Sequence, residues 1–379
     1  MPAFQENSVL ESIIGNENVM GYLLESIKRD RIAKAYLFYG PPSVGKFKTA
    51  IAFVAAVLCG EGGCGKCNTC RRVLELKHPD VLVVEGRGKN IPVEVIREIR
   101  LSAYLKPVEG KYRFFIIRDA EMLWEEGAST LLKLLEEPPQ GSIFILISAS
   151  IASVMPTLIS RCEKVRFTPV PREKIAEMLV KRGIDFNKAD LIARVTGGLP
   201  GNAIKLADEP WRMERRDTVL RVARALKHAD LATILDMAEE LYAEIRAPIE
   251  EMAVIYKERK QELSDLMDES ALKRFAKAID EEYSQERLRE EINGVKEALQ
   301  ILFSWYRDIL VMKECNSKEM LVNVDFIQEI ESESRVMKED CVVRIIRSID
   351  DAFKAVDQNV PAQLVLEGAL TEIQEAIRA

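Results

Sequence analysis

Five short apolar runs, separated by helix-like segments, constrain the fold of the first half of the chain most strongly. Each run is too short for a helix and does not alternate strictly between apolar and polar residues, which is typical of strands buried on both faces of a parallel sheet. Because strand and helix alternate, we predict an α/β domain with a five-stranded parallel sheet. The runs are AYLFYG (35–40), VLVVE (81–85), RFFII (113–117), SIFILIS (142–148) and KVRF (164–167).

The strand signals end after residue 167, and the rest of the chain has helical patterns. A short helical unit surrounds the turn TGGLPG (196–201), and the C-terminal part is charged and amphipathic throughout. A length of 379 residues is typical of two or three domains. We therefore predict three domains, over residues 1–167, 168–208 and 209–379.

The stretch GPPSVGKFKTA (40–50) has the spacing of a phosphate-binding loop between a strand and a helix. In such a loop, backbone N–H groups of a glycine-rich turn and of the helix N-terminus surround phosphate oxygens. Gly40 and Gly45 would shape the turn, and Lys46 would reach the β and γ phosphates. The sequence therefore predicts a site for ATP or ADP, although a glycine- and proline-rich turn before a helix is the alternative.

Two positions depart from the pattern of an active ATPase. A Ser or Thr normally follows the lysine and binds Mg²⁺ through its hydroxyl, whereas this chain has Phe47. The acid that holds Mg²⁺ normally follows an apolar strand, and here RFFII is followed by Arg118. Asp119, shifted by one residue, or Glu121 could take that role, or these charges are a solvated cluster at a strand end.

Four of the seven cysteines lie close together, in the pattern Cys59-x4-Cys64-x2-Cys67-x2-Cys70. In a reducing compartment, such clustering indicates a metal site before it indicates disulfides. Four thiolates complete the tetrahedral shell of Zn²⁺ and leave no open position, which is the structural arrangement. We predict a structural zinc site; an iron–sulfur cluster and free buried thiols are the alternatives.

The charge balance and hydropathy limit the partners. A net charge of −7 argues against a protein that coats DNA by itself, because such binding depends on many Lys and Arg contacts with phosphate. No apolar run approaches the roughly 18 residues that span a bilayer. The first residues also lack the basic and apolar regions of a secretion signal. We therefore expect a cytoplasmic protein with no membrane partner.

Three further motifs complete a resemblance to a known family: STLLKLLEEPP (129–139), PTLISRC (156–162) and TGGLPGNAIKL (196–206). Together with the loop and the cysteines, they resemble the clamp loader of bacterial DNA polymerase III, an AAA+ family whose subunits form a ring of five. Within that family the pattern is most similar to the delta-prime type. The resemblance implies an AAA+ domain with a zinc module at 59–70, a helical lid domain and an all-α C-terminal oligomerisation domain.

The resemblance also implies partners and a role for one arginine. The partners would be gamma/tau-type and delta-type subunits in a hetero-pentamer, with the sliding clamp and primed DNA contacted through the complex. In the motor subunits, the arginine of Ser-Arg-Cys enters the ATP site of the neighbouring subunit, and Arg161 has this position here. A guanidinium supplied in trans stabilises the transferring phosphoryl group, an effect of about 10³ to 10⁵ in rate in GTPases.

A further departure lies in the predicted lid. Motor subunits carry an arginine there that senses the γ phosphate, and this chain has Gly201 or Asn202 at that place. Together with Phe47 and Arg118, this predicts a subunit with little or no ATPase activity of its own that still offers Arg161 to a neighbour. The alternatives are an ATP-hydrolysing subunit of the gamma/tau type and a nucleotide-binding switch without turnover.

Overall fold

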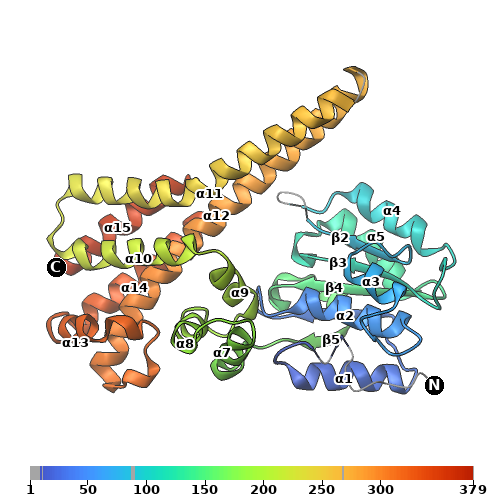
Figure 1. The fold of residues 1–379 in the computed structure, drawn as a ribbon, viewed down its shortest axis with the longest axis horizontal. Helices are drawn as coiled ribbons and strands as arrows, with labels where there is room; N and C mark the ends of the chain where they lie inside the picture. The colour runs from blue at the N-terminus through green and yellow to red at the C-terminus, as the bar shows by residue number, and fades with distance from the viewer. Residues whose placement is uncertain (1–8, 11, 87–89, 267–268, 379) are drawn as a thin grey trace. The chain divides into compact units, whose positions relative to one another are not determined.

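The computed structural model describes residues 9–378 except 11, 87–89 and 267–268. The chain forms two compact units, Met1–Ala207 and Asp208–Ala379, which we call the N-terminal and C-terminal units (Figure 1). The N-terminal unit contains a sheet with helices on both faces, and the C-terminal unit is helical. The division into domains at 167 and 208 stays a prediction.

The predicted five-stranded parallel sheet is confirmed. Its strands lie in the order β2-β3-β4-β1-β5, and each neighbouring pair is parallel. The central strand β4 is buried along its whole length, which explains its unbroken apolar sequence. The strands are β1 (Ala35–Tyr39), β2 (Val81–Val84), β3 (Arg113–Ile117), β4 (Ser142–Ser148) and β5 (Glu163–Arg166).

Helices cover the sheet on both faces because successive strand residues point to opposite sides. In β1, Tyr36 and Phe38 pack in the core formed with α1, α2 and α3, whereas Leu37 packs in the core formed with α4 and α5. These helices are α1 (Glu17–Lys28), α2 (Lys46–Leu58), α3 (Asn68–Leu74), α4 (Val93–Ala103) and α5 (Glu125–Glu136). The sheet therefore holds the β1–α2 connection on a rigid base.

Shorter helices complete the N-terminal unit around and after β5. The one-turn helix α6 (Pro156–Ile159) precedes β5, and the Ser-Arg-Cys triplet (160–162) follows it directly. Three helices follow the sheet: α7 (Arg172–Lys181), α8 (Phe186–Val195) and α9 (Pro200–Asp208). The turn between α8 and α9 is the glycine-rich TGGLPG segment, with positive φ at Gly197 and Gly198.

The C-terminal unit is helical, as predicted, and has a core of its own. The side chain of Trp305 is fully buried in this core, next to Tyr306 at 1% exposure. The helices are α10 (Trp211–Ala225), α11 (Leu231–Leu266), α12 (Glu269–Cys315), α13 (Ile327–Val336), α14 (Glu339–Asp357) and α15 (Ala362–Arg378). Among the described residues, none of the helices combines the length and the apolar character needed to cross a bilayer.

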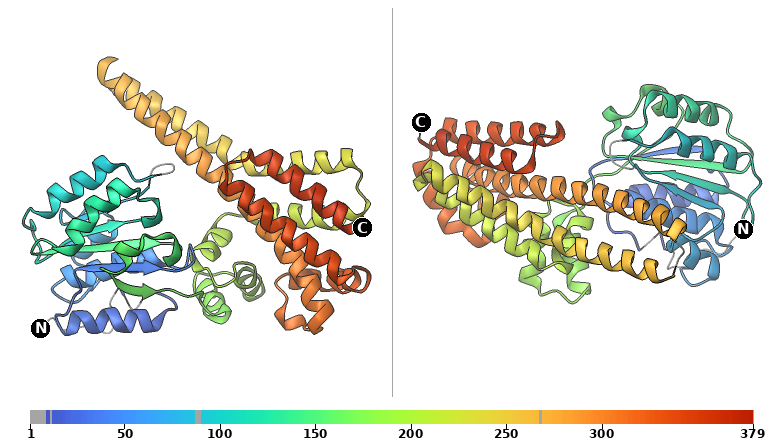
Figure 2. Two further views of the ribbon diagram at one scale, coloured as in Figure 1. Left: turned by 180° about the vertical axis from the view of Figure 1, so that it is seen from behind. Right: turned by 90° about the horizontal axis from the view of Figure 1, so that it is seen from above.

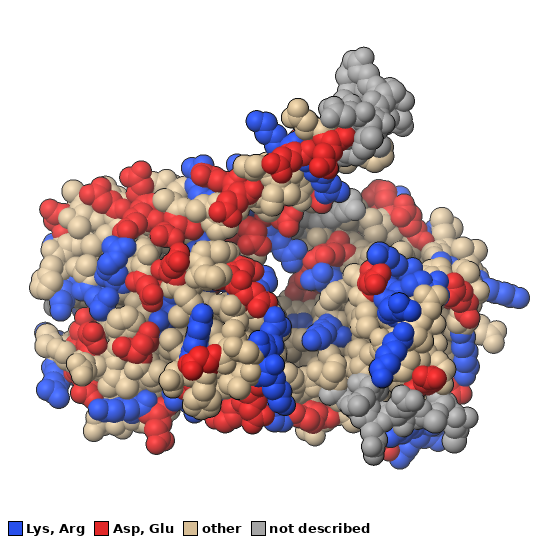
Figure 3. Space-filling view, viewed as in Figure 1, with Lys and Arg blue, Asp and Glu red and all other residues tan. Residues whose placement is uncertain are grey.

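The two longest helices, α11 and α12, run side by side as a helical hairpin (Figure 2). Polar side-chain pairs connect α11 to α12 along the length of the hairpin. Tyr242 donates a hydrogen bond to Glu291 at 2.8 Å, and Lys260 lies 2.7 Å from Asp280. On the face seen in Figure 3, acidic and basic side chains are interspersed over the surface.

Candidate functional site

The predicted phosphate-binding loop joins the end of β1 to the start of α2, and glycine geometry shapes it. Gly40 has a φ of +145°, and a side chain there would lie 2.3 Å from the carbonyl oxygen of Phe167. Gly45 has a φ of +105° and directly precedes α2. A glycine turn that leads into a helix N-terminus is the arrangement that binds phosphate in nucleotide sites.

Lys46, the first residue of α2, folds back onto this loop. Its Nζ donates hydrogen bonds to the carbonyl oxygens of Gly40 at 2.5 Å and Pro41 at 2.7 Å. Burial lowers the pKa of Lys46 to about 8, although the charges of Glu121 and Asp119 act in the opposite direction. The loop therefore brings together Gly40, Gly45 and Lys46, and its own carbonyl groups hold the ammonium.

Phe47 and Arg118, the two departures predicted to weaken catalysis, contact each other. The Arg118 guanidinium lies over the Phe47 ring, 4.5 Å from its centre, and pairs with Glu85 at 2.8 Å. A cation over an aromatic ring is attracted to the negative face of that ring. A positive charge therefore lies beside the residue that replaces the usual metal-binding hydroxyl.

The acids after β3, Asp119 and Glu121, lie close enough to Lys46 to act on its charge. Asp119 has a left-handed backbone, with a φ of +55°, at the turn that follows β3. Glu121 accepts a hydrogen bond from the N–H of Ala149 at 3.1 Å through Oε1. Its buried Oε2 has no hydrogen-bond partner in the described part of the chain. Glu121 is thus the acid with an uncommitted oxygen at this site.

The third departure, Gly201, touches the loop directly. The N–H of Gly201, at the start of α9, donates to the carbonyl oxygen of Ser43 at 2.9 Å. A Cβ atom at position 201 would lie 3.0 Å from that oxygen and 3.1 Å from the Ser43 Cβ. A side chain here would crowd Ser43, so the loop or α9 would have to shift by a few tenths of an ångström to accept it.

The four clustered cysteines connect the end of α2 to α3, and their sulfur atoms converge. All four Sγ atoms lie within 4.8 Å of one another, with separations of 3.8 Å for Cys59–Cys64 and 3.7 Å for Cys59–Cys67. A tetrahedral Zn²⁺ site with Zn–S bonds of about 2.3 Å has sulfur–sulfur edges of roughly 3.8 Å. The cluster is therefore compatible with a structural metal such as zinc.

The surroundings of the cysteines act on their ionisation in both directions, because burial raises the pKa of the Cys70 thiol whereas backbone N–H groups favour the thiolate of Cys59. The Glu61 N–H donates to the sulfur of Cys59 at 3.4 Å, and the Cys70 N–H donates to that of Cys67 at 3.3 Å. Burial opposes ionisation of Cys59, but backbone N–H groups around it lower the pKa of this thiol to about 7. None of these cysteines forms a disulfide. A closed set of four sulfur ligands is the pattern of a structural rather than a catalytic metal.

Arg161 lies between α6 and β5 and pairs within its own chain. Its guanidinium donates to the carbonyl oxygen of Thr157 at 3.0 Å and to the Ser160 hydroxyl at 3.2 Å, and forms an ion pair with Glu136 of α5. The Arg161 side chain retains 34% of its exposure. The contact joins two of the sequence motifs, Ser-Arg-Cys and Leu-Leu-Glu-Glu-Pro-Pro.

Three partners of the predicted residues did not stand out in the sequence: Ser43, Glu85 and Glu136. Each belongs to a segment that the sequence analysis quotes, but nothing in the sequence pairs it with Gly201, Arg118 or Arg161. Covariation among relatives is the signal that could have connected these positions.

A family model described as "DNA polymerase III, delta subunit" matches residues 15–171. The chain is 25% identical over 360 residues to DNA polymerase III subunit delta′ of Bacillus subtilis, which covers 94% of this chain and 95% of that protein. It is 30% identical over 244 residues to DNA polymerase III subunit gamma/tau of Mycobacterium tuberculosis, which covers 61% of this chain and 42% of that protein. Among solved structures, RuvB of Thermotoga maritima matches with a TM-score of 0.40 and 19% identity, over 56% of this chain and 65% of that chain.

Proposed function

Because the chain belongs to the AAA+ clamp-loader family of DNA polymerase III delta′ subunits, we propose that it is the non-hydrolysing subunit of a sliding-clamp loader in DNA replication. It joins gamma/tau-type and delta-type subunits in a hetero-pentamer through its C-terminal helices. The complex, rather than this chain alone, engages the sliding clamp and primed DNA. In this role the chain supplies Arg161 to the ATP site of a neighbouring subunit.

The contact between Phe47 and Arg118 carries the proposal that the chain does not hydrolyse ATP. Phosphoryl transfer depends on Mg²⁺ to neutralise charge on the β and γ phosphates. Phe47 offers no ligand atom, and the residue that directly follows β3, where the metal-holding acid is normally found, is Arg118, a cation held by the Phe47 ring and by Glu85 that cannot bind a metal. A substitution that restores the usual residue at position 47 or at position 118 alone would still leave the other departure from the ATPase pattern in place.

The contact between Gly201 and Ser43 supports the same conclusion. In the motor subunits that the sequence resembles, a lid arginine senses the γ phosphate. Here the lid position has no arginine, its backbone N–H bonds to the loop, and a side chain at this place would crowd Ser43. Lys46, Gly40 and Gly45 would still hold the phosphates of ATP or ADP, but without the groups that promote hydrolysis.

Arg161 is suited to leave its present partner. Ion pairs at exposed positions contribute about 0 to 1 kcal/mol, and both side chains of the Arg161–Glu136 pair are partly exposed, at 34% and 49%. A γ-phosphate offers the guanidinium the same kind of charge-assisted hydrogen bonds as a carboxylate, with more negative charge. The free-energy cost of exchanging Glu136 for the phosphate of a neighbouring subunit is therefore small. The cysteine cluster, with structural zinc, stabilises the N-terminal unit and takes no part in this exchange of partners by Arg161.

Steady-state ATPase measurements with Mg²⁺ test the proposal, first on this chain alone and then on the complex rebuilt with its gamma/tau-type and delta-type partners. We expect no significant turnover from the isolated chain. In the complex, Arg161→Ala should slow hydrolysis at the neighbouring site by about 10³-fold, the lower end of the arginine-finger effect. Lys164→Ala, an exposed change three residues further on, serves as the control and should leave the rate unchanged.

Two results would contradict this function. Robust turnover by the isolated chain that is lost on Lys46→Ala would favour the ATP-hydrolysing gamma/tau type, with Glu121 or Asp119 handling the metal. An assembled Arg161→Ala complex with normal ATPase activity would remove the role of this arginine.

A further inference from the structure

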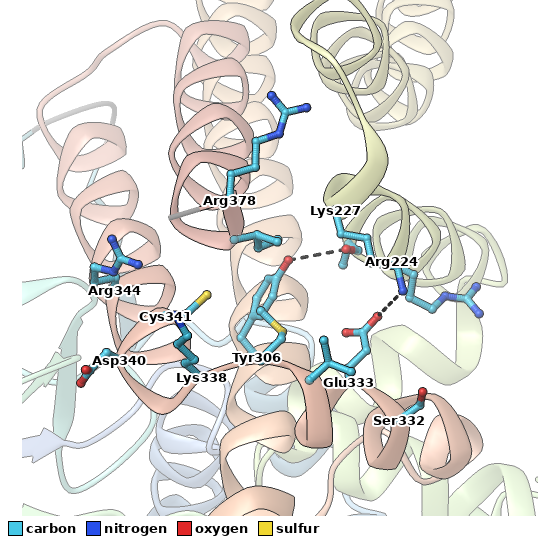
Figure 4. A pocket seen from close by; sticks show the side chains of 14 residues that line it. Arg224, Lys227, Tyr306, Ser332, Glu333, Lys338, Asp340, Cys341, Arg344 and Arg378 are labelled. Carbon is cyan, nitrogen blue, oxygen red and sulfur yellow. Dashed lines mark hydrogen bonds and ion pairs between the residues drawn. The ribbon is translucent and has the colours of Figure 1, made fainter.

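The C-terminal unit contains a cavity that the proposed function does not use. Its volume is about 650 Å³, which is within the range of about 300 to 1,000 Å³ for ligand sites. Side chains from α10, α12, α13, α14, α15 and the short helix η3 (Leu226–His228) line it (Figure 4). Segments distant in the sequence therefore converge on one concave site, which we call the cationic cavity.

Positive side chains dominate the lining. Five cations and two acids face the cavity, which gives a local charge of 5 − 2 = +3 in a chain with a net charge of −7. In Figure 4, cations come from opposite sides, with Arg344 on one side of Tyr306 and Arg224 on the other. The lining cations are Arg224, Lys227, Lys338, Arg344 and Arg378, and the acids are Glu333 and Asp340.

Only two long ion pairs connect these cations to carboxylates of the described residues. Arg224 lies 3.9 Å from Glu329, and Lys227 lies 4.0 Å from Glu333. These are the shortest ion pairs that the five cations make with described residues. Weakly paired cations gathered around a concave site attract negative groups from solvent.

The two arginines of α14 and α15 use their guanidinium groups to bond neutral backbone oxygens. Arg344 donates to the carbonyl oxygen of Ala376 at 3.3 Å, and Arg378 donates to that of Ala229 at 2.8 Å. Such bonds orient a guanidinium without cancelling its charge, and each group keeps further N–H donors. Both arginines are thus held in place for an incoming carboxylate.

The floor and one edge of the cavity are apolar. Tyr306 and Ala223 are buried beneath it, and Met337 and Ile377 line its walls. Val336, at the edge, is 81% exposed, an unusual position for a large apolar side chain. An apolar group that entered the cavity would contact this surface while negative groups beside it faced the cations.

We propose that the cationic cavity binds an acidic peptide segment of a partner protein, which inserts one large apolar side chain and pairs its carboxylates with the surrounding cations. Charge complementarity and the apolar floor together point to this class of ligand. Arginine clusters recognise acidic motifs through charge-assisted hydrogen bonds, and apolar anchors in pockets supply much of the binding energy. Nucleic acid fits less well, because single strands stack on exposed aromatic rings and Tyr306 is only 1% exposed.

Fluorescence anisotropy with the full chain tests this site. The probe is a fluorescein-labelled peptide, GDDEFLEDDG, compared with GNNQFLQNNG, which lacks the charges, and GDDESSEDDG, which lacks the apolar anchor. We expect each control peptide to bind at least about tenfold more weakly, since both the charges and the anchor contribute. Binding of the first peptide should also weaken as salt rises.

Substitutions in the chain complete the test. Lys338→Glu and Arg344→Glu should each weaken binding by about tenfold or more, since each replaces an attraction by a repulsion. Arg347→Glu makes the same change of charge on α14 outside the cavity and should weaken binding clearly less than either cavity substitution, because it removes no direct contact. Lys338 makes no side-chain hydrogen bond or ion pair with the described residues, and a melting curve of each variant verifies its fold.

Three outcomes would overturn the proposal. Equal binding of the uncharged peptide would exclude recognition of carboxylates. Equal loss of binding in the Arg347→Glu variant would show a general charge effect. Binding of a single-stranded oligonucleotide, with no binding of the acidic peptide, would assign the cavity to nucleic acid instead.

Discussion

The cysteine cluster offers the sharpest test of the N-terminal unit, through the substitution Cys70→Ser. Two sulfur–sulfur separations in the cluster, 3.7 and 3.8 Å, are close to the tetrahedral edge of roughly 3.8 Å that Zn–S bonds of about 2.3 Å require. Cys70 is fully buried, so a metal at this site would contact the core directly. We therefore expect purified protein to contain about one zinc per chain.

The size of the effect can be bounded. Loss of an outer partner of a metal ligand lowers affinity about 10- to 100-fold, or about 1.4 to 2.8 kcal/mol, and loss of a ligand should exceed that. In a unit of 150 to 250 residues, each kcal/mol shifts the melting temperature by roughly 2 to 4 °C. The Cys70→Ser variant should thus melt at least about 3 to 11 °C lower. Complete loss of zinc would have a larger effect, since structural zinc binds peptides with about 10 to 16 kcal/mol.

Elemental analysis and differential scanning calorimetry, which records the unfolding of both units, provide the assay. The control is Cys315→Ser, because Cys315 is exposed, lies in the C-terminal unit and has no neighbouring cysteine in the sequence. It should retain zinc and melt like the parent protein. The metal assignment fails if the protein contains iron or no metal, or if both variants melt alike.

Two further substitutions test how buried contacts hold the N-terminal unit. Burial opposes ionisation of Asp80, but three backbone N–H groups at 108–110 donate to its carboxylate at 2.6 to 2.9 Å and lower its pKa. Asp80→Asn should therefore destabilise by about 1.5 to 3 kcal/mol at neutral pH in urea unfolding. The difference should begin to shrink below about pH 3.9, where the carboxylate of the unfolded chain protonates, and should continue to shrink until the native carboxylate protonates at its lower pKa; a difference independent of pH would refute this. Gly201→Arg should not create ATPase activity. It should lower the free energy of unfolding by about 1 to 3 kcal/mol, because its Cβ would crowd Ser43. A variant that is active and as stable as the parent protein would show that the loop and α9 separate freely.

Much of the fold could be predicted from the sequence because burial on both faces leaves an unmistakable pattern. The run SIFILIS (142–148) coincides with β4, and the run RFFII (113–117) with β3. The order of the strands could not be predicted, since it depends on long-range pairing and not on local sequence. The lengths of α11 and α12 were also not evident, because charged amphipathic helices carry weak signals at their ends.

Some candidate sites could also be predicted from the sequence, and others could not. The cysteines and the phosphate-binding loop are local motifs, and the structure brings their members together as their spacing suggests. The contact of Phe47 with Arg118 spans 118 − 47 = 71 residues, and that of Arg161 with Glu136 joins two different elements. The cationic cavity is assembled from six helices and has no motif in the sequence. Such features depend on tertiary packing, which a single sequence does not reveal.

The strand order has a consequence for the growing chain during synthesis. β1 ends at Tyr39, but its two neighbours in the sheet are β4 and β5, which leave the ribosome last among the five strands. Until then both edges of β1 lack their partners, and such unpaired edges favour association with other chains. Gly40 also packs against Phe167, just beyond β5. The oldest strand and the loop beside it are thus the last parts of the sheet to mature, and chaperones have the longest time to act on them.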